Sequence, residues 1–276
     1  MSGENETPKV VLKIDLSAAN KIAEIGIRRA AAFLKISQKL EWNAVPEHLA
    51  LDGGIDYGFF PQFIDEEARK NIHAEYQAWV LGAALKEIDQ HFSLFLDAVW
   101  NNLELSDWHG KKVHSSELVP NDERFASDTN SARKLEKIAT RIGSDFSSKH
   151  IDSLSRARNL LTHGIGQVRR RDLNVDGALA ITWLGLDLIA DDGDQKIIVN
   201  DHPLNTHPLH LPHGAELTLK FTERTKLISL GHLLRFSERE LAEICFYYQS
   251  VIDKLLKDTS GYLLAKFGKA NPAAEA

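Results

Sequence analysis

The sequence feature that most constrains the fold is residues 65–105, a long stretch that contains no proline and a single glycine. Large apolar side chains recur through it at steps of three and four residues, the spacing that places them along one side of an α-helix. Asp65, Glu66 and Glu67 stand at its start, where the partial positive charge of a helix N-terminus favours anions. We predict a long helix here, with room for a break near its middle because few globular helices reach this length.

Four further segments show helical patterns. They cover about 17–40, 131–146, 148–171 and 237–259. The first and the last begin with a serine, whose hydroxyl can accept a hydrogen bond from the free backbone N–H groups of the first turn. Together with the long helix, these segments predict a mainly α-helical protein.

Before the last helix, the apolar pattern changes from that of a helix to that of short strands. The runs rich in β-branched residues cover about 178–189, 196–199, 217–221 and 227–230. Polar turn residues separate them. We therefore predict a small antiparallel β insertion at about 177–235.

Residues 43–63 are interrupted by prolines and glycines, which predicts an irregular linker. The linker divides the 276-residue chain into two parts. Residues 1–62 form a predicted N-terminal helical extension and linker. Residues 63–267 form a predicted helical domain that includes the β insertion.

The composition limits where and with what the protein acts. Its 33 Lys and Arg face 39 Asp and Glu, a net charge of −6, so any nucleic-acid site must be a local basic patch. The single cysteine, Cys245, cannot form an internal disulfide, which fits a reducing compartment. No apolar run reaches the roughly 20 residues that span a membrane, and the polar N-terminal segment is unlike a secretory signal. We expect a soluble cytoplasmic protein that does not associate with membranes.

Residues 155–164, SRARNLLTHG, carry the most chemical information. Asn159 and His163 are four residues apart and so share one face of the predicted helix. Arg158 and His163 are five apart, about 140° round the helix, so Arg158 must use its length to reach a common cleft. A second copy related by two-fold symmetry would bring another such pair to the same place.

These residue types suffice for metal-free cleavage of RNA. Arginine offers a fixed charge and donors that match phosphate oxygens, histidine exchanges protons near neutral pH, and asparagine orients a neighbour without titrating. RNA supplies its own nucleophile, because its 2′-hydroxyl can attack the adjacent phosphorus once a base removes the proton. No serine, cysteine or metal is required.

The pattern resembles the ribonuclease members of the HEPN superfamily, which carry an arginine, four to six residues and then a histidine, often with asparagine directly after the arginine. Here the four intervening residues are Asn-Leu-Leu-Thr, between Arg158 and His163. The resemblance covers about residues 63–175 and 236–262. It implies a HEPN-like helical bundle that forms a homodimer, with two facing motifs making one composite ribonuclease site.

The resemblance assigns Arg158 and His163 as catalytic and Asn159 as their supporting polar residue, with no metal and no cofactor. It implies RNA as substrate and a 2′,3′-cyclic phosphate as product. It also implies a toxin–antitoxin or antiviral defence role, with a neutralising antitoxin or regulatory protein as a partner. Family toxins that are silenced by nucleotide transfer have a tyrosine two residues after the histidine, whereas this chain has Ile165. That form of silencing is not expected.

Further arginines lie close to the motif. Arg156, Arg169, Arg170 and Arg171 could grip the RNA backbone and form the basic patch that an acidic protein needs. The alternative is that the last three only decorate a helix C-terminus, where cations are favourable.

Other interpretations compete with catalysis. Arg158 and His163 could make ordinary structural hydrogen bonds, and the bundle would then be a non-catalytic HEPN-like module for dimerisation or protein binding. A metal-dependent hydrolase is a weaker alternative, since its histidines are crowded among prolines without a helix to set their geometry. These histidines are His202, His207, His210 and His213.

Two sequence patterns are interpreted as structural. Trp79 and Trp100 lie in the long predicted helix, and we expect them in the core rather than as base-stacking platforms. Asp191, Asp192 and Asp194 resemble a calcium loop only in composition, so we predict a polar turn.

Overall fold

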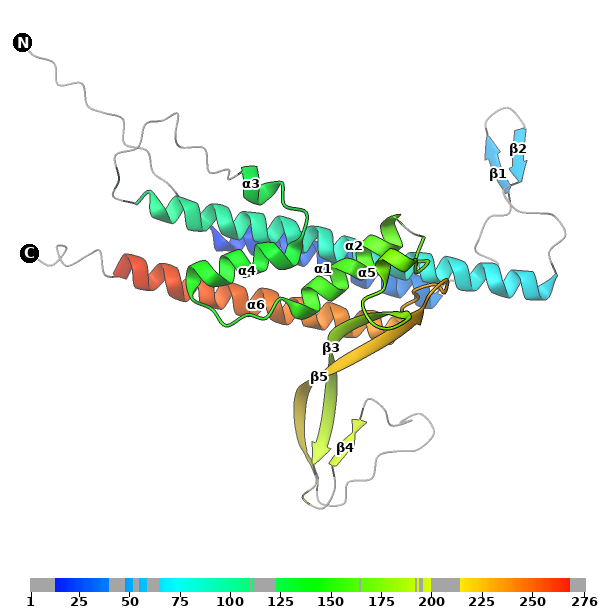
Figure 1. The fold of residues 1–276 in the computed structure, drawn as a ribbon. Coiled ribbons are helices and arrows are strands. Elements are labelled where there is room, and N and C mark those ends of the chain that lie inside the picture. The colour runs from blue at the N-terminus through cyan, green and yellow to red at the C-terminus, as the bar shows by residue number, and fades with distance from the viewer. Residues whose placement is uncertain are drawn as a thin grey trace, which may run out of the picture.

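The computed structural model shows a mainly helical protein with an antiparallel sheet before the last helix (Figure 1). It describes residues 13–39, 48–51, 55–58, 65–109, 111, 123–163, 165–191, 193, 196–199 and 214–268. Within these ranges, no helix is long and apolar enough to cross a membrane. The coarse fold prediction, mainly α with a β insertion, is confirmed.

Helices form the body of the protein. They are α1 (Leu16–Lys39), α2 (Glu66–Asp107), α3 (Glu123–Ala126), α4 (Ser131–Ile142), α5 (Lys149–His163) and α6 (Glu238–Gly268), with a short 3₁₀-helix η3 (Arg170–Asp172) after α5. The strands are β1 (His48–Leu51), β2 (Ile55–Gly58), β3 (Ala178–Asp191), β4 (Lys196–Ile198) and β5 (Glu216–Ser229). Helices α1, α2 and α6 run side by side, and α4 and α5 lie over them (Figure 1).

The predicted long helix is confirmed as α2, and it has no break. The Asp65 carboxylate caps its start by accepting a hydrogen bond from the Ala68 N–H at 2.7 Å. Along its length Leu85, Phe92 and Val99 are fully or almost fully buried. A continuous buried stripe therefore holds the helix straight through the bundle.

Helix α1 packs against both α2 and α6. Its buried positions are small residues, among them Ala19, Ala23 and Gly26, which let the two backbones approach closely. A methyl group added at Gly26 would lie 2.5 Å from Cβ of His91, closer than packed atoms tolerate. The N-terminal helix thus contributes to the same core as the rest of the bundle.

The predicted helix over 148–171 is wrong at its C-terminal end, because α5 ends at His163. Ile165 and Gly166 both adopt positive φ angles, 53° and 77°, which turn the chain back. The next residues bond to the chain after β5 instead of continuing the helix. Val168 N–H donates to the carbonyl of His232 at 2.9 Å, and Leu234 N–H donates to the carbonyl of Gly166 at 2.8 Å. The predicted helix 131–146 likewise ends early, at Ile142, before the left-handed Gly143.

The predicted strands 217–221 and 227–230 are one continuous strand, β5. It pairs antiparallel with β3 from Ala178↔Ser229 to Asp191↔Glu216, and β4 pairs with the other edge of β3. Charged residues between the two apolar runs suggested a break in the sequence, but they find partners: Arg224 binds Asp187, and Lys226 binds Glu240. The charges therefore interrupt the pattern without interrupting the strand.

The predicted irregular linker at 43–63 is also wrong in part. It contains β1 and β2, which pair antiparallel from His48↔Gly58 to Leu51↔Ile55. The two strands are separated by three residues in the sequence, and their pairing shows regular structure where the prolines and glycines predicted none.

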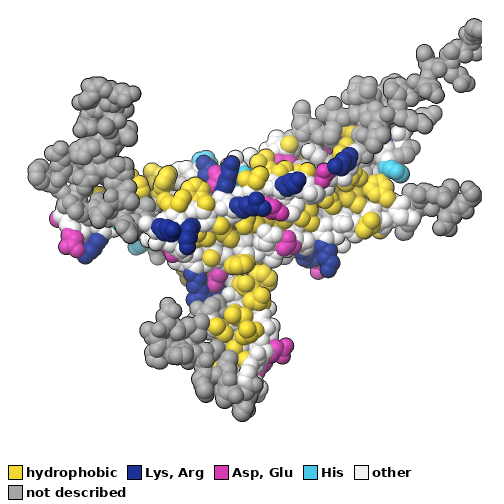
Figure 2. Space-filling view, turned by 180° about the vertical axis from the view of Figure 1, so that it is seen from behind, with side chains coloured by type: hydrophobic (Ala, Val, Ile, Leu, Met, Phe, Trp, Pro, Cys, Tyr) yellow, Lys and Arg dark blue, Asp and Glu magenta, His cyan; other side chains and the backbone are white. Residues whose placement is uncertain are grey.

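The far half of the β3–β5 hairpin projects from the side of the bundle (Figure 1). Leu217, Leu219 and Phe221 alternate along β5 and are exposed on one face of it. Hydrophobic side chains cover part of this projecting sheet (Figure 2). The near half of the hairpin is anchored, since Ile181 and Trp183 are buried in the common core.

The close contact between α1 and α2 generates a stability prediction. Gly26→Ala should destabilise the protein by about 1–3 kcal/mol, because the added methyl group overpacks the contact with His91. Urea unfolding followed by circular dichroism measures this. The matched control is Gly261→Ala in α6, where no atom lies within 4 Å of the new methyl group and helix propensity should raise stability. Equal midpoints for the two variants would contradict the proposed close approach.

Candidate functional site

One cavity of about 600 Å³ collects most of the predicted site residues. Six of the seven line it: Arg156, Arg158, Asn159, His163, Arg169 and Arg171. The seventh, Arg170, is exposed and does not line the cavity.

Two elements form the walls. Helix α5 presents Arg156, Asn159 and His163 at steps of three and four residues, so they share one face. The opposite wall is the turn that contains Arg169 and Arg171, folded back after α5. The Asp172 carboxylate stabilises this turn by accepting a hydrogen bond from the Arg169 N–H at 2.9 Å. Leucines complete the lining, at positions 160, 173 and 179.

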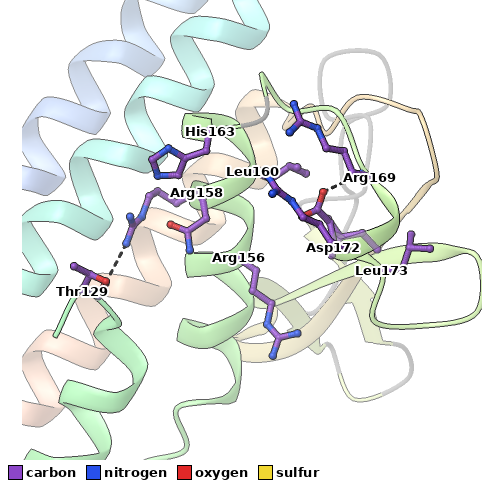
Figure 3. A pocket seen from close by; sticks show the side chains of 11 residues that line it. Thr129, Arg156, Arg158, Leu160, His163, Arg169, Asp172 and Leu173 are labelled. Carbon is purple, nitrogen blue, oxygen red and sulfur yellow. Dashed lines mark hydrogen bonds and ion pairs between the residues drawn. The ribbon is translucent and has the colours of Figure 1, made fainter.

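Arg158 is held in place by an acidic residue of α2. Its Nε donates to Oδ2 of Asp89 at 2.8 Å, and its Nη2 lies 2.7 Å from the same oxygen. Nη2 also donates to the carbonyl of Thr129 at 3.4 Å, as Figure 3 shows. The Arg158 side chain is 19% exposed, so it is mostly enclosed yet still reaches the cavity. Among the described residues, its Nη1 has no hydrogen-bond partner.

Asp89 itself is fully buried and joins three helices. Its Oδ1 accepts a hydrogen bond from Ser155 Oγ at 3.1 Å and another from the Tyr248 hydroxyl of α6 at 3.0 Å. Burial, reinforced by the Asp89 carboxylate, raises the pKa of Tyr248 well above its ordinary value, so this hydroxyl remains a donor.

Asp89 is not among the site residues predicted from the sequence. The signal that could have found it is a carboxylate on the apolar stripe of α2, with Leu85 and Phe92 on either side of it along the helix. A buried carboxylate requires a cation or several donors, so such a position predicts a partner such as Arg158.

His163 and Asn159 differ from Arg158 because both are exposed. Neither has a hydrogen-bond partner among the residues that the structure describes. In Figure 3 the His163 ring and the Arg158 guanidinium lie on the same side of α5, toward Thr129. The His163 ring is therefore accessible to a molecule bound in the cavity, on the side of α5 where the Arg158 guanidinium lies.

The flanking arginines give the cavity a positive character. Arg156 pairs with Asp152 at 2.8 Å on the outer surface of α5, and Arg171 lies 3.8 Å from Asp172. The alternative that Arg169, Arg170 and Arg171 decorate the C-terminus of the predicted helix 148–171 is wrong, because α5 ends at His163. Arg169 precedes the short helix η3, and Arg170 and Arg171 lie in it. One carboxylate, Asp172, lines the cavity beside its four arginines. An anionic ligand is therefore favoured.

The predictions for the two tryptophans, the aspartate-rich turn and the histidine-rich segment have different outcomes. Trp100 fits its core assignment, since its ring stacks on Phe125 at 4.4 Å, but Trp79 is 67% exposed and its assignment is wrong. Asp191 binds Lys196 and the Gly193 N–H, while its two neighbouring aspartates lie outside the described residues. The histidine-rich segment at 202–213 also lies outside them. Within the described part, no group of three or more His, Cys, Asp or Glu is placed to hold a metal ion.

No protein-family model, curated protein or solved structure matches this chain. The interpretation of the cavity therefore depends on its own geometry and chemistry.

The buried Asp89 generates the second prediction. Asp89→Ala should cost about 3–5 kcal/mol of stability, because it leaves the Arg158 charge unpaired and removes the acceptor of Tyr248. Asp152→Ala is the control, since it breaks an exposed ion pair with Arg156 and should change stability by no more than about 1 kcal/mol. Urea unfolding midpoints compare the variants. Similar midpoints for both would show that the Asp89 cluster does not hold the helices together.

Proposed function

We propose that this protein is a HEPN-type, metal-independent endoribonuclease. The observation that carries the proposal is a fixed guanidinium and an exposed imidazole in one arginine-lined cavity: Arg158, anchored by buried Asp89, and His163. This arrangement supplies charge stabilisation and proton transfer, the two requirements for RNA cleavage by its own 2′-hydroxyl.

The proposed reaction uses two proton transfers, one from the RNA to a base and one from an acid to the RNA. A base takes the proton of the 2′-hydroxyl, the freed oxygen attacks the adjacent phosphorus, and the bond from phosphorus to the 5′-oxygen breaks. An acid protonates that leaving oxygen. The products are a 2′,3′-cyclic phosphate and a 5′-hydroxyl. His163 serves one of these proton transfers, Arg158 stabilises the negative charge on the phosphoryl oxygens through its unpaired Nη1, and Asn159 orients the bound phosphate or ring.

The cavity supports a homodimer as the active form. Among the described residues, His163 is the one histidine that lines it, whereas the reaction uses both a base and an acid. A second copy facing the first would supply the same histidine from the other side. Arg156, Arg169 and Arg171 would then hold phosphates on either side of the cleaved bond.

The biological setting is proposed from the family resemblance. A ribonuclease of this type would act in toxin–antitoxin control or antiviral defence, and a neutralising protein would keep it inactive. The arginine-lined cavity is the surface that such an inhibitor would have to cover.

A second candidate is a non-catalytic HEPN-like module that binds another protein. It is favoured by the exposed apolar side chains Leu217, Leu219 and Phe221 on the projecting hairpin, and by the structural ion pair that Arg158 makes. This candidate predicts intact folding and no RNA cleavage.

Cleavage of RNA in EDTA tests the first candidate. The purified protein should cut a labelled single-stranded RNA and leave a cyclic phosphate, while His163→Ala should lower the rate by about 10²–10⁴-fold. Arg169→Ala should weaken substrate binding, whereas Arg170→Ala, which alters a neighbouring arginine outside the cavity, should have a much smaller effect. Gel analysis of the products and their end groups measures each outcome.

Arg158 needs a milder substitution, because removing its side chain would leave the buried Asp89 carboxylate without its cation. Arg158→Lys keeps the positive charge but removes the planar fork, so the rate should fall while the fold persists. Circular dichroism and the oligomeric state check the fold of each variant. Wild type and variants that are all folded and equally inert on transfer, messenger and ribosomal RNA would favour the non-catalytic candidate.

A further inference from the structure

A second surface lies beside the cavity, on α2. Trp79 is 67% exposed, and the ring of Tyr76 meets it edge-on with the centroids 6.4 Å apart. The two rings and Glu75 line a shallow hollow of about 350 Å³. We call Tyr76 and Trp79 the aromatic platform.

Contacts between α2 and α5 place this platform at the level of the proposed site. The two helices run antiparallel here, because Asp89 binds Arg158 whereas Gly82, two turns earlier, faces Leu161 at 3.5 Å. Trp79 lies about one turn before Gly82 on α2. It therefore stands beside the C-terminal end of α5, where His163 is located.

The platform also lies on the side of α5 from which Arg158 reaches the cavity. Trp79 is about 60° round α2 from Gly82, in the same direction as Asp97, eighteen residues later. Asp97 binds Lys134 of α4 at 2.7 Å, so this side of α2 faces α4. Thr129, just before α4, accepts a hydrogen bond from Arg158 of α5. In Figure 3 the His163 ring lies on the same side of α5 as the Arg158 guanidinium.

The exposure of Trp79 has no explanation in the packing of the described residues, since Trp79 does not belong to the core cluster. A tryptophan is usually buried for most of its surface. Lys86 lies seven residues later on the same face of α2 and is exposed, which adds a cation between the platform and the level of Arg158. The exposed Trp79 ring, with the half-buried Tyr76 ring against its edge and a nearby cation, fits a ligand that has both a flat face and a negative charge.

We infer that the aromatic platform stacks an unpaired base of the RNA strand, next to the nucleotide held at Arg158 and His163. This inference rests on the proposed function and specifies its substrate as single-stranded RNA. Stacking requires a base whose face is free, and the bases of a duplex already stack on one another. Lys86 would contact the connecting phosphate, and the Glu75 carboxylate could accept a hydrogen bond from an amino group of the base.

Binding of a non-cleavable RNA separates this inference from catalysis. We choose a fluorescently labelled 2′-O-methyl single-stranded oligoribonucleotide, which lacks the nucleophile, and measure anisotropy with the full chain. Trp79→Ala should weaken binding about tenfold, and Trp79→Phe much less, because phenylalanine keeps a ring for stacking. Leu264→Ala is the control, because it removes a side chain that is 71% exposed near the C-terminal end of α6 and should leave binding unchanged.

Intrinsic fluorescence gives a second readout. The chain has five tryptophans, so the signal of Trp79 is obtained as the difference between wild type and Trp79→Phe. Stacking on a base should quench that difference signal upon RNA addition. The same oligonucleotide annealed to its complement should bind with equal affinity to wild type and Trp79→Ala.

The outcomes distinguish the two proposals. Loss of affinity in Trp79→Ala with no cleavage of ordinary RNA would support the platform and overturn the nuclease. Equal affinity of wild type and Trp79→Ala for the single strand would overturn the platform, even if the wild type cleaves RNA. Absence of both binding and cleavage would overturn both.

Discussion

A carboxylate with no access to water must be compensated by donors, and the Asp89 carboxylate obtains them from two other helices. Arg158 and Ser155 approach from α5 and Tyr248 from α6. The cluster therefore fixes the rotation of α5 against the bundle, and with it the direction in which the motif faces. The same contact that satisfies a buried charge also immobilises the guanidinium that the proposed chemistry requires.

The β insertion takes part in building the site. Residues 231–234, which follow β5, form backbone hydrogen bonds with residues 166–168. These bonds hold the turn after α5 against the end of the insertion. Gly166 has φ 77°, and a methyl group there would lie 3.2 Å from the carbonyl oxygen of Leu234. This tight crossing places Arg169 and Arg171 opposite α5 and closes the cavity. The positions of Arg169 and Arg171 thus depend on a β insertion that follows them in the chain.

The sequence was informative where one local pattern determined the outcome. The long apolar period predicted α2, the capping serine predicted the start of α6, and the spacing of Asn159 and His163 predicted a shared face. It was less informative where the local structure depends on contacts with distant segments of the chain. The end of α5 depends on bonds to residues 231–234, and the continuity of β5 depends on partners such as Asp187 and Glu240. Asp89 was missed because its role exists only once α2, α5 and α6 meet.

The single cysteine has a practical consequence for spectroscopy. Cys245 is partly buried in α6, and burial raises the pKa of its thiol to about 12. Because only the thiolate reacts readily with alkylating reagents, Cys245 stays almost entirely unreactive near neutral pH. A new cysteine on the exposed surface would then be the one site that takes a dye or spin label. Distances between labelled copies would test the proposed dimer on a chain that keeps its native thiol.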